Sequence, residues 1–147
     1  MSKAERRADV VWRGTLTRGD GTLTLTSGVA AGLPVTWASR TERSEGKTSP
    51  EELIAAAHAS CFCMALSGGL TEAGTPPDEL HATATTTFDQ TPDGFRVATS
   101  HIDVTGTVPG LDAAGFAKAA EAAKDGCPVS QALKGNVALS VTARLEE

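Results

Sequence analysis

The stretch TSPEELIAAAHASCFCMAL, residues 48–66, marks the start of a long helix around which the rest of the chain is arranged. Ser49 is suited to cap this helix, Pro50 favours the first helical position, and Glu52 completes a Ser-x-x-Glu capping box. Acidic residues in the first turn also suit the positive end of the helix dipole. We therefore expect a helix that starts at Pro50 and continues to about Ser67, where following glycines weaken it.

Alternating apolar and polar residues on both sides of this helix predict strands. The expected strands are residues 10–17, 22–26, 35–39, 79–89, 95–108 and 137–145. Two shorter helices are expected between the last two strands: one N-capped by Asp112 and running to about Lys124, the other starting at Cys127-Pro128 and ending near Leu133. This order of elements predicts an α+β fold with antiparallel sheets packed around a long buried helix.

Size and composition indicate one soluble domain, residues 1–147. Charged residues make up 21% of the chain and apolar residues 40%, and the net charge is −5. An acidic chain is a poor ligand for nucleic acid or an anionic membrane, because phosphate binding draws on Lys and Arg. The segment 53–70 is too rich in small and polar residues for a membrane span, and the N-terminus lacks the apolar core of a signal peptide. We expect a cytoplasmic protein without a cofactor.

The chain has three cysteines, which in a reducing compartment serve as core filler, metal ligands or reactive thiols. Cys61 and Cys63 lie two residues apart on the expected helix, so their thiols face different ways. Cys63 is most simply a packing residue. Cys127 occupies an N-cap position, which favours a thiolate, although the nearby Asp125 opposes it. These local features leave the roles of Cys61 and Cys127 open.

A zinc site is the competing interpretation of the same residues. His58, Cys61, Cys63 and Cys127 offer imidazole and thiolate ligands. Cys-x-Cys on a helix splays its thiols apart, however, and no second close ligand pair accompanies Cys127, so we expect no metal. By itself, His58 is most simply a core histidine, and Arg40 is most simply a surface charge.

Two motifs carry a family resemblance that covers nearly the whole chain. The run from Thr48 to Phe62, followed by Met64-Ala65-Leu66, closely resembles the first cysteine motif of the OsmC/Ohr family of peroxidases. The run GCPVSQAL, residues 126–133, is similar to the second cysteine motif of that family. The His-Ala-Ser-Cys form at residues 58–61 resembles the OsmC branch rather than the Ohr branch.

The resemblance implies a two-cysteine hydroperoxidase built as an intertwined homodimer. It makes Cys61 the peroxidatic thiol and Cys127 the resolving thiol, with a Cys61–Cys127 disulfide as the oxidised product. Arg40 would be the activating arginine, with Arg43 as a competitor for that role, and Glu51 the conserved acidic residue. A dithiol, such as that of a lipoylated protein, would reduce the disulfide. Apolar residues around Cys61 favour organic hydroperoxides over hydrogen peroxide.

The length of the helix adds a geometric constraint to this scheme. Cys61 lies too far from the N-terminus for the helix dipole to stabilise its thiolate, so a guanidinium such as that of Arg40 is needed. Glu51 would hold Arg40 in a bidentate pair. Glu51 and Cys61 are ten residues, or about 15 Å, apart along one helix. We therefore expect Glu51 and Arg40 to serve Cys61 of a partner chain.

The rival function is a non-catalytic module that binds a lipid or small ligand on the same fold, since a fold alone does not define a function. The joint presence of Arg40, Glu51, Cys61 and Cys127 argues against this rival, because a binding module has no need of all four.

Overall fold

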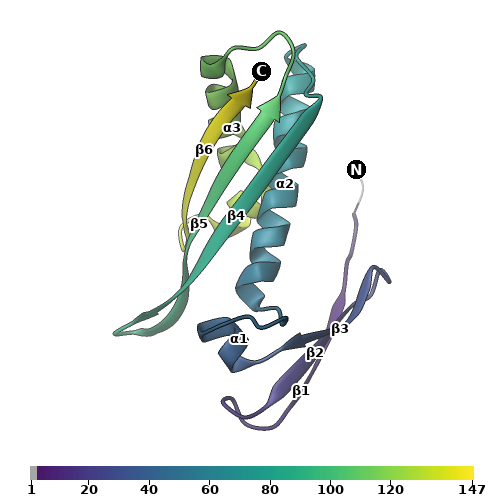
Figure 1. The fold of residues 1–147 in the computed structure, drawn as a ribbon, viewed down its shortest axis with the longest axis vertical. Coiled ribbons are helices and arrows are strands. Elements are labelled where there is room, and N and C mark those ends of the chain that lie inside the picture. The colour runs from purple at the N-terminus through teal and green to yellow at the C-terminus, as the bar shows by residue number, and fades with distance from the viewer. Residues whose placement is uncertain (1–2) are drawn as a thin grey trace. The chain divides into compact units, whose positions relative to one another are not determined.

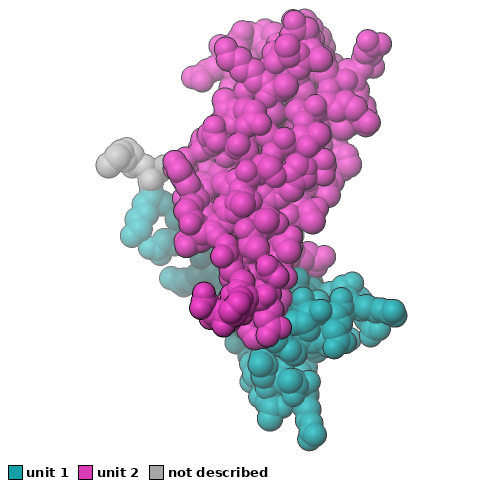
Figure 2. All heavy atoms as spheres, turned by 90° about the vertical axis from the view of Figure 1, so that its left-hand side faces the viewer, with its two compact units in different colours: residues 1–50 teal, residues 51–147 magenta. Residues whose placement is uncertain are grey.

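The computed structural model describes residues 3–147, which fall into two compact units (Figure 2). The first unit extends to Pro50, and the second covers Glu51–Glu147. Each unit has its own antiparallel or mixed three-stranded sheet. All three cysteines belong to the second unit.

The first unit is an antiparallel meander followed by a short helix. Its elements are β1 (Ala8–Arg13), β2 (Asp20–Leu25), β3 (Ala30–Val35) and α1 (Trp37–Thr41), with the strands in the order β1-β2-β3. The expected strand at residues 35–39 is wrong, because the third strand ends at Val35. Thr36 caps α1 through a capping box in which its side chain accepts from the Ser39 backbone N–H and the Ser39 hydroxyl accepts from the Thr36 N–H.

Ser39 also ties α1 to the segment that enters the long helix. Its hydroxyl donates to the carbonyl of Thr48 at 2.8 Å, and the N–H of Thr48 donates to the carbonyl of Pro34 at 2.9 Å. An isolated parallel bridge pairs Val35 with Thr48. The polar loop at residues 42–47 therefore begins and ends at fixed points.

The long helix α2 spans Pro50–Glu72, starting where expected and ending five residues later than expected. Gly68 and Gly69 do not stop it. It ends in a Schellman motif, in which Thr75 N–H donates to the carbonyl of Leu70 and Gly74 adopts a φ of +88°. The cost of two helical glycines is about 1 kcal/mol each, which packing of the flanking buried leucines can offset.

The sheet of the second unit has the order β4-β5-β6, formed by β4 (Glu79–Thr91), β5 (Gly94–Thr107) and β6 (Ala138–Glu146). β4 and β5 form a long antiparallel hairpin. β6 pairs with β5 in parallel, so the two sheets are largely antiparallel, with one parallel pair at this edge. The helices α3 (Ala113–Gly126) and α4 (Pro128–Leu133) form the crossover that a parallel pair requires.

Helices α2 and α3 cover one face of this sheet (Figure 1), and the core lies between the helices and the sheet. Asp112 caps α3 as expected, with its carboxylate accepting from the N–H of Gly115 at 2.7 Å. The buried apolar side chains come from α2, β5, α3 and the residues that follow β5 and α3: Phe62, Leu66, Leu70, Ile102, Val104, Val108, Phe116, Ala120, Ala123 and Cys127. The α+β fold is thus confirmed, with the sheet of the second unit packed against the long helix.

In a single chain, only one face of α2 is buried. The buried positions are Glu51, His58, Phe62, Leu66 and Leu70, whereas the Met64 side chain is 71% exposed. By length and composition alone, α2 is long and apolar enough to cross a membrane, although its small and polar residues predict a buried helix. Core helices of soluble proteins meet the same criterion, and α2 packs against a sheet through the face described above.

Candidate active site

The structure brings Cys61 and Cys127 together inside the second unit. Cys61 is a half-buried residue in the middle of α2 and packs against the core cluster that contains Cys127. Cys127 is fully buried between α3 and α4. The Cys127 thiol, 66 positions away in the sequence, is close enough to raise the pKa of the Cys61 thiol, and both thiols are free.

Cys127 caps α4 as expected, with Pro128 in the first turn. Its sulfur accepts a hydrogen bond from the backbone N–H of Ser130 at 3.3 Å, and its thiol donates to the hydroxyl of Ser130 at 3.1 Å. Its own N–H donates to the carbonyl of Ala123 at 2.9 Å, which closes α3. One residue therefore ends one helix and starts the next, and this double role fixes the position of its sulfur.

Burial raises the pKa of the Cys61 thiol above its ordinary value. A hydrogen bond from the backbone of Val129 acts in the opposite direction, and interaction with Cys127 raises the pKa further. None of the groups that shift this pKa, in the part of the chain that is described, is a cation. The second unit by itself therefore holds Cys61 as a thiol, and a nearby positive charge is needed to make it a thiolate.

His58 is fully buried one turn before Cys61 and uses both ring nitrogens. Nδ1 lies 2.7 Å from the hydroxyl of Ser100 on β5, and Nε2 lies 2.9 Å from the hydroxyl of Ser130 on α4. Burial lowers the pKa of His58, which favours the neutral ring. The placement of His58 as a core histidine with partners is thus confirmed.

The third cysteine, Cys63, is half-buried on another face of α2, and burial raises the pKa of its thiol. This environment suits the packing role expected for it. Across residues 3–147, no group of three or more His, Cys, Asp or Glu side chains is placed to hold a metal ion.

Arg40 lies in α1 of the first unit rather than at the end of a strand, as the sequence had suggested. Its guanidinium carbon lies 5.9 Å from the centroid of the Trp37 ring, a distance typical of a cation–π contact. The Arg40 side chain is half-buried, whereas Arg43 is exposed in the loop that follows. Because Arg40 packs against Trp37 and Arg43 is exposed, Arg40 is the better candidate of the two for the activating arginine.

Glu51 stands at the start of the second unit, in the first turn of α2. It is only 6% exposed although it is a carboxylate, whereas its neighbour Glu52 is exposed. Burying a carboxylate is costly unless it is paired and hydrogen-bonded. The burial of Glu51 therefore indicates a carboxylate that is held by other groups, unlike that of an ordinary surface glutamate.

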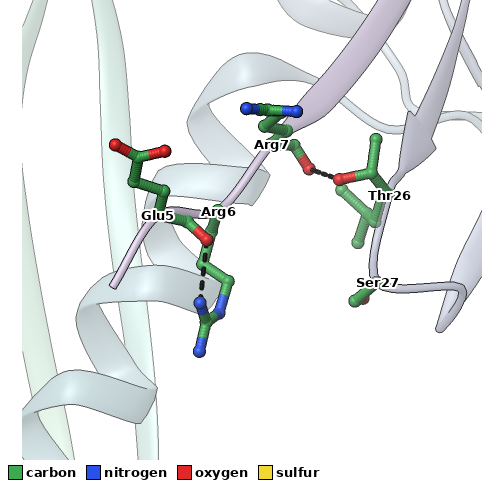
Figure 3. Close-up of a pocket in the computed structure, with 6 residues that line it drawn as sticks. Glu5, Arg6, Arg7, Thr26 and Ser27 are labelled. Carbon is green, nitrogen blue, oxygen red and sulfur yellow. Dashed lines mark hydrogen bonds between the residues drawn. The ribbon is translucent and has the colours of Figure 1, made fainter. Parts of the chain in front are cut away.

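A hollow in the first unit is a different kind of site. It measures about 720 Å³ and is lined by Glu5, Arg6, Arg7, Leu25, Thr26 and Ser27 (Figure 3). The side chain of Arg6 donates a hydrogen bond to the backbone carbonyl of Glu5, and the hydroxyl of Thr26 donates one to the carbonyl of Arg7. No thiol or buried titratable group lines it, so the cysteine pair in the second unit is the stronger candidate for chemistry.

Sequence reasoning did not identify Ser100 and Ser130 as members of the site. For Ser130 the sequence did hold a local signal. An N-cap side chain accepts from the N–H of the residue three positions on, and Ser130 lies three residues after the N-cap Cys127. Ser100 had no comparable signal, since only the pairing of β5 under α2 places it beneath His58.

The site is thus a pair of neighbouring thiols, one supplied by the long helix α2 and the other by the cap between α3 and α4. A family model described as "OsmC-like protein" matches residues 43–142. The chain belongs to the OsmC family.

Individual relatives extend this assignment to most of the chain. The peroxiredoxin OsmC of Escherichia coli (strain K12) is 42% identical over 134 residues, which cover 91% of this chain and 93% of the relative. The organic hydroperoxide resistance protein of Xanthomonas axonopodis pv. citri (strain 306) is 30% identical over 96 residues, covering 65% and 66%. The crystal structure of the organic hydroperoxide resistance protein OhrB of Bacillus subtilis superposes with a TM-score of 0.73 at 25% identity, covering 95% of this chain and 98% of that one.

Proposed function

We propose that this protein reduces organic hydroperoxides to alcohols through Cys61 and Cys127. The chain is a peroxidase of the OsmC family, as its relatives named peroxiredoxin and organic hydroperoxide resistance protein indicate. The observation that carries the two-cysteine scheme is the packing of Cys61 against Cys127 within one unit. A half-buried thiol next to a fully buried one is a suitable arrangement for attack followed by resolution.

In the proposed cycle, the Cys61 thiolate attacks the outer oxygen of the hydroperoxide, and the O–O bond breaks to release an alcohol. Cys61 becomes a sulfenic acid. Cys127 then attacks the Cys61 sulfur, and the product is a Cys61–Cys127 disulfide and water. A dithiol returns both cysteines to thiols by exchange.

Activation of Cys61 is assigned to Arg40 and Glu51 of a partner copy. Burial raises the pKa of Cys61, so a guanidinium is needed to favour its thiolate. Glu51 is separated from Cys61 by ten residues of continuous helix, or about 15 Å. An antiparallel two-fold pairing of the α2 helices, with the start of one beside the middle of the other, would place these groups at the partner's thiol.

The exposed apolar surface supports a homodimer. In this proposal, residues 1–147 of each chain form one OsmC-like domain. Met64 on α2 is 71% exposed, and β1 leaves Val10, Val11 and Trp12 at 58%, 48% and 41%. Apolar surface of this kind is typical of a protein–protein interface. We place this dimer in the cytoplasm, without a nucleic-acid or membrane partner, and assign its reduction to a dithiol such as a lipoylated protein.

The test is consumption of an alkyl hydroperoxide with a dithiol reductant, comparing wild type with Cys61→Ser, Cys127→Ser and Cys63→Ser. The first variant should lose activity. The second should stop at the Cys61 sulfenic acid, which a sulfenic-acid-specific reagent would trap. The matched control Cys63→Ser, on the same helix, should behave as wild type.

Two outcomes would contradict this scheme. Full activity of Cys61→Ser would exclude Cys61 as the attacking thiol. Undiminished turnover of Cys127→Ser with the dithiol, and no Cys61–Cys127 disulfide in the oxidised wild type, would exclude Cys127 as the resolving thiol.

A further inference from the structure

A chain of buried polar side chains runs from the sheet, through α2, to Cys127. It consists of Thr86, Ser100, His58, Ser130 and Cys127, which come from β4, β5, α2, α4 and the cap between α3 and α4. The last four are between 0% and 1% exposed. These groups lie within an apolar core, where a polar group is stable only when it is hydrogen-bonded.

With the thiol protonated and His58 carrying its proton on Nδ1, each of these hydrogen bonds has a donor and an acceptor. Cys127 donates to the oxygen of Ser130 at 3.1 Å, which leaves the single hydroxyl hydrogen of Ser130 for Nε2 of His58 at 2.9 Å. Nε2 is then the acceptor, so Nδ1 carries the proton and donates to Ser100 at 2.7 Å. Ser100 in turn has Thr86 within 3.3 Å. The thiol is therefore linked, through one hydroxyl, to the free lone pair of an imidazole.

We propose that Ser130 and His58 form the proton acceptor of Cys127 during resolution, with Ser130 in contact with the reacting sulfur and His58 acting through it. This inference rests on the proposed two-cysteine cycle. It assigns a role to a histidine that the first step, the attack on the peroxide, does not use.

The step balances as follows. The Cys127 S–H proton passes to the oxygen of Ser130 while the Ser130 hydroxyl proton passes to Nε2 of His58. The Cys127 sulfur attacks the sulfur of Cys61–SOH, the S–S bond forms, and the S–O bond breaks. The leaving hydroxide takes a proton from solvent, and His58 later returns its proton to solvent, so the net products are one disulfide and one water. No external oxidant or reductant is required.

The surroundings of His58 suit an acceptor. Burial lowers its pKa, so the ring is neutral and ready to take a proton at neutral pH. Its partners from the sheet, Ser100 and, beyond it, Thr86, are uncharged hydroxyls. On the other side, Ser130 links the ring to the thiol of Cys127. Because none of these partners is a carboxylate, the protonated ring is disfavoured and the proton is held only transiently.

A second histidine provides a matched control. His101 also bonds a serine through Nδ1, with Ser140 at 2.6 Å, but it lies on the other face of the sheet beside Asp103. It shares the chemistry of His58 and has no path to a thiol. The substitution His101→Gln should therefore leave the rate of resolution unchanged.

The test separates the two half-reactions in single-turnover experiments with an alkyl hydroperoxide. His58→Gln keeps an acceptor for Ser130 and a donor for Ser100 but cannot take up a proton. We expect Cys61 sulfenic acid to form within about threefold of the wild-type rate, whereas disulfide closure at pH 7 slows by about 100-fold, the lower range for proton transfer by a positioned side chain. In this variant, closure should become faster as the pH is raised from 7 to 8.5, because it depends on the free thiolate. The wild-type rate should change little over this range.

Ser130→Ala should show the same slow, pH-dependent closure, and Ser130→Thr, which keeps the hydroxyl, should restore the fast step. These variants decide the question if His58→Gln does not fold. Closure at the wild-type rate in His58→Gln or Ser130→Ala, or an equal loss in both half-reactions, would overturn the proposal. If wild type itself forms no Cys61–Cys127 disulfide, the two-cysteine function fails instead, which is a distinguishable result.

Discussion

The proposal that Arg40 of one chain activates Cys61 of its partner predicts complementation between two inactive variants. Along α2, Glu51 and Cys61 are separated by about 15 Å, roughly three times the 5–6 Å between neighbouring side chains on a helix. A guanidinium held by Glu51 is therefore badly placed for the thiol of its own chain. In trans, the same separation presents no obstacle.

The perturbation combines Arg40→Met in one protomer with Cys61→Ser in the other. Each variant alone should be inactive, since every site lacks either the guanidinium or the attacking thiol. In the mixed dimer, one site pairs the intact Arg40 with the intact Cys61, and the other site lacks both. Purified mixed dimers should therefore show about half of the wild-type rate, and an equimolar random mixture about a quarter, because only half of its dimers are mixed.

The assay is hydroperoxide consumption by dimers purified through two different affinity tags, one on each chain. The matched control replaces Arg40→Met by Arg43→Met, and the Arg43→Met homodimer should be active by itself if Arg40 is the activating residue. Inactive mixed dimers, under conditions in which re-formed wild-type dimers are active, would refute the assignment in trans. A fully active monomer would refute it as well.

Two further predictions concern stability. Burial lowers the pKa of His58 below the unfolded value of about 6.5, so the unfolded state binds more protons at acid pH. The free energy of unfolding should therefore fall by up to about 1.4 kcal/mol per pH unit as the pH drops below 6.5. Urea titrations at pH 7 and pH 5 should show a smaller fall for His58→Gln than for wild type. Gly106→Ala should destabilise the fold by about 1–3 kcal/mol, because the new Cβ would lie 2.6 Å from Cζ of Phe116. The control Gly126→Ala, whose Cβ meets open space, should leave the stability unchanged. Equal midpoints of thermal unfolding for the two variants would contradict this account.

The features that the sequence predicted well are those with local causes. The start of α2 at Pro50, the cap by Asp112 and the cap by Cys127 before Pro128 each depend on side chains within a few residues of one another. The short helix α1 had such a signal too, in Thr36 and Ser39, but the β-branched residues beside it favoured a strand. The capping box favoured a helix and the β-branched residues favoured a strand, and in the structure the helix forms.

The features that were missed depend on contacts between distant residues. The parallel pairing of β6 with β5 is decided by where α3 and α4 return the chain, and no strand pattern specifies it. The helix α2 passes through Gly68 and Gly69 because neighbouring leucines pack in the core. Likewise, the partners of His58 lie 42 and 72 residues away, so its sequence neighbourhood could predict burial and not the connection to Cys127.

The different burial of the two thiols gives an argument for their order that is independent of any motif. A hydroperoxide comes from solvent, so the first attacking thiol must be accessible, and Cys61 is half-buried whereas Cys127 is 0% exposed. The second thiol needs to reach only the first, and its burial protects it from direct oxidation by the substrate. Burial also deprives Cys127 of water as a proton acceptor, so an internal acceptor is needed. The chain through Ser130 to His58 occupies the place where such an acceptor would have to be.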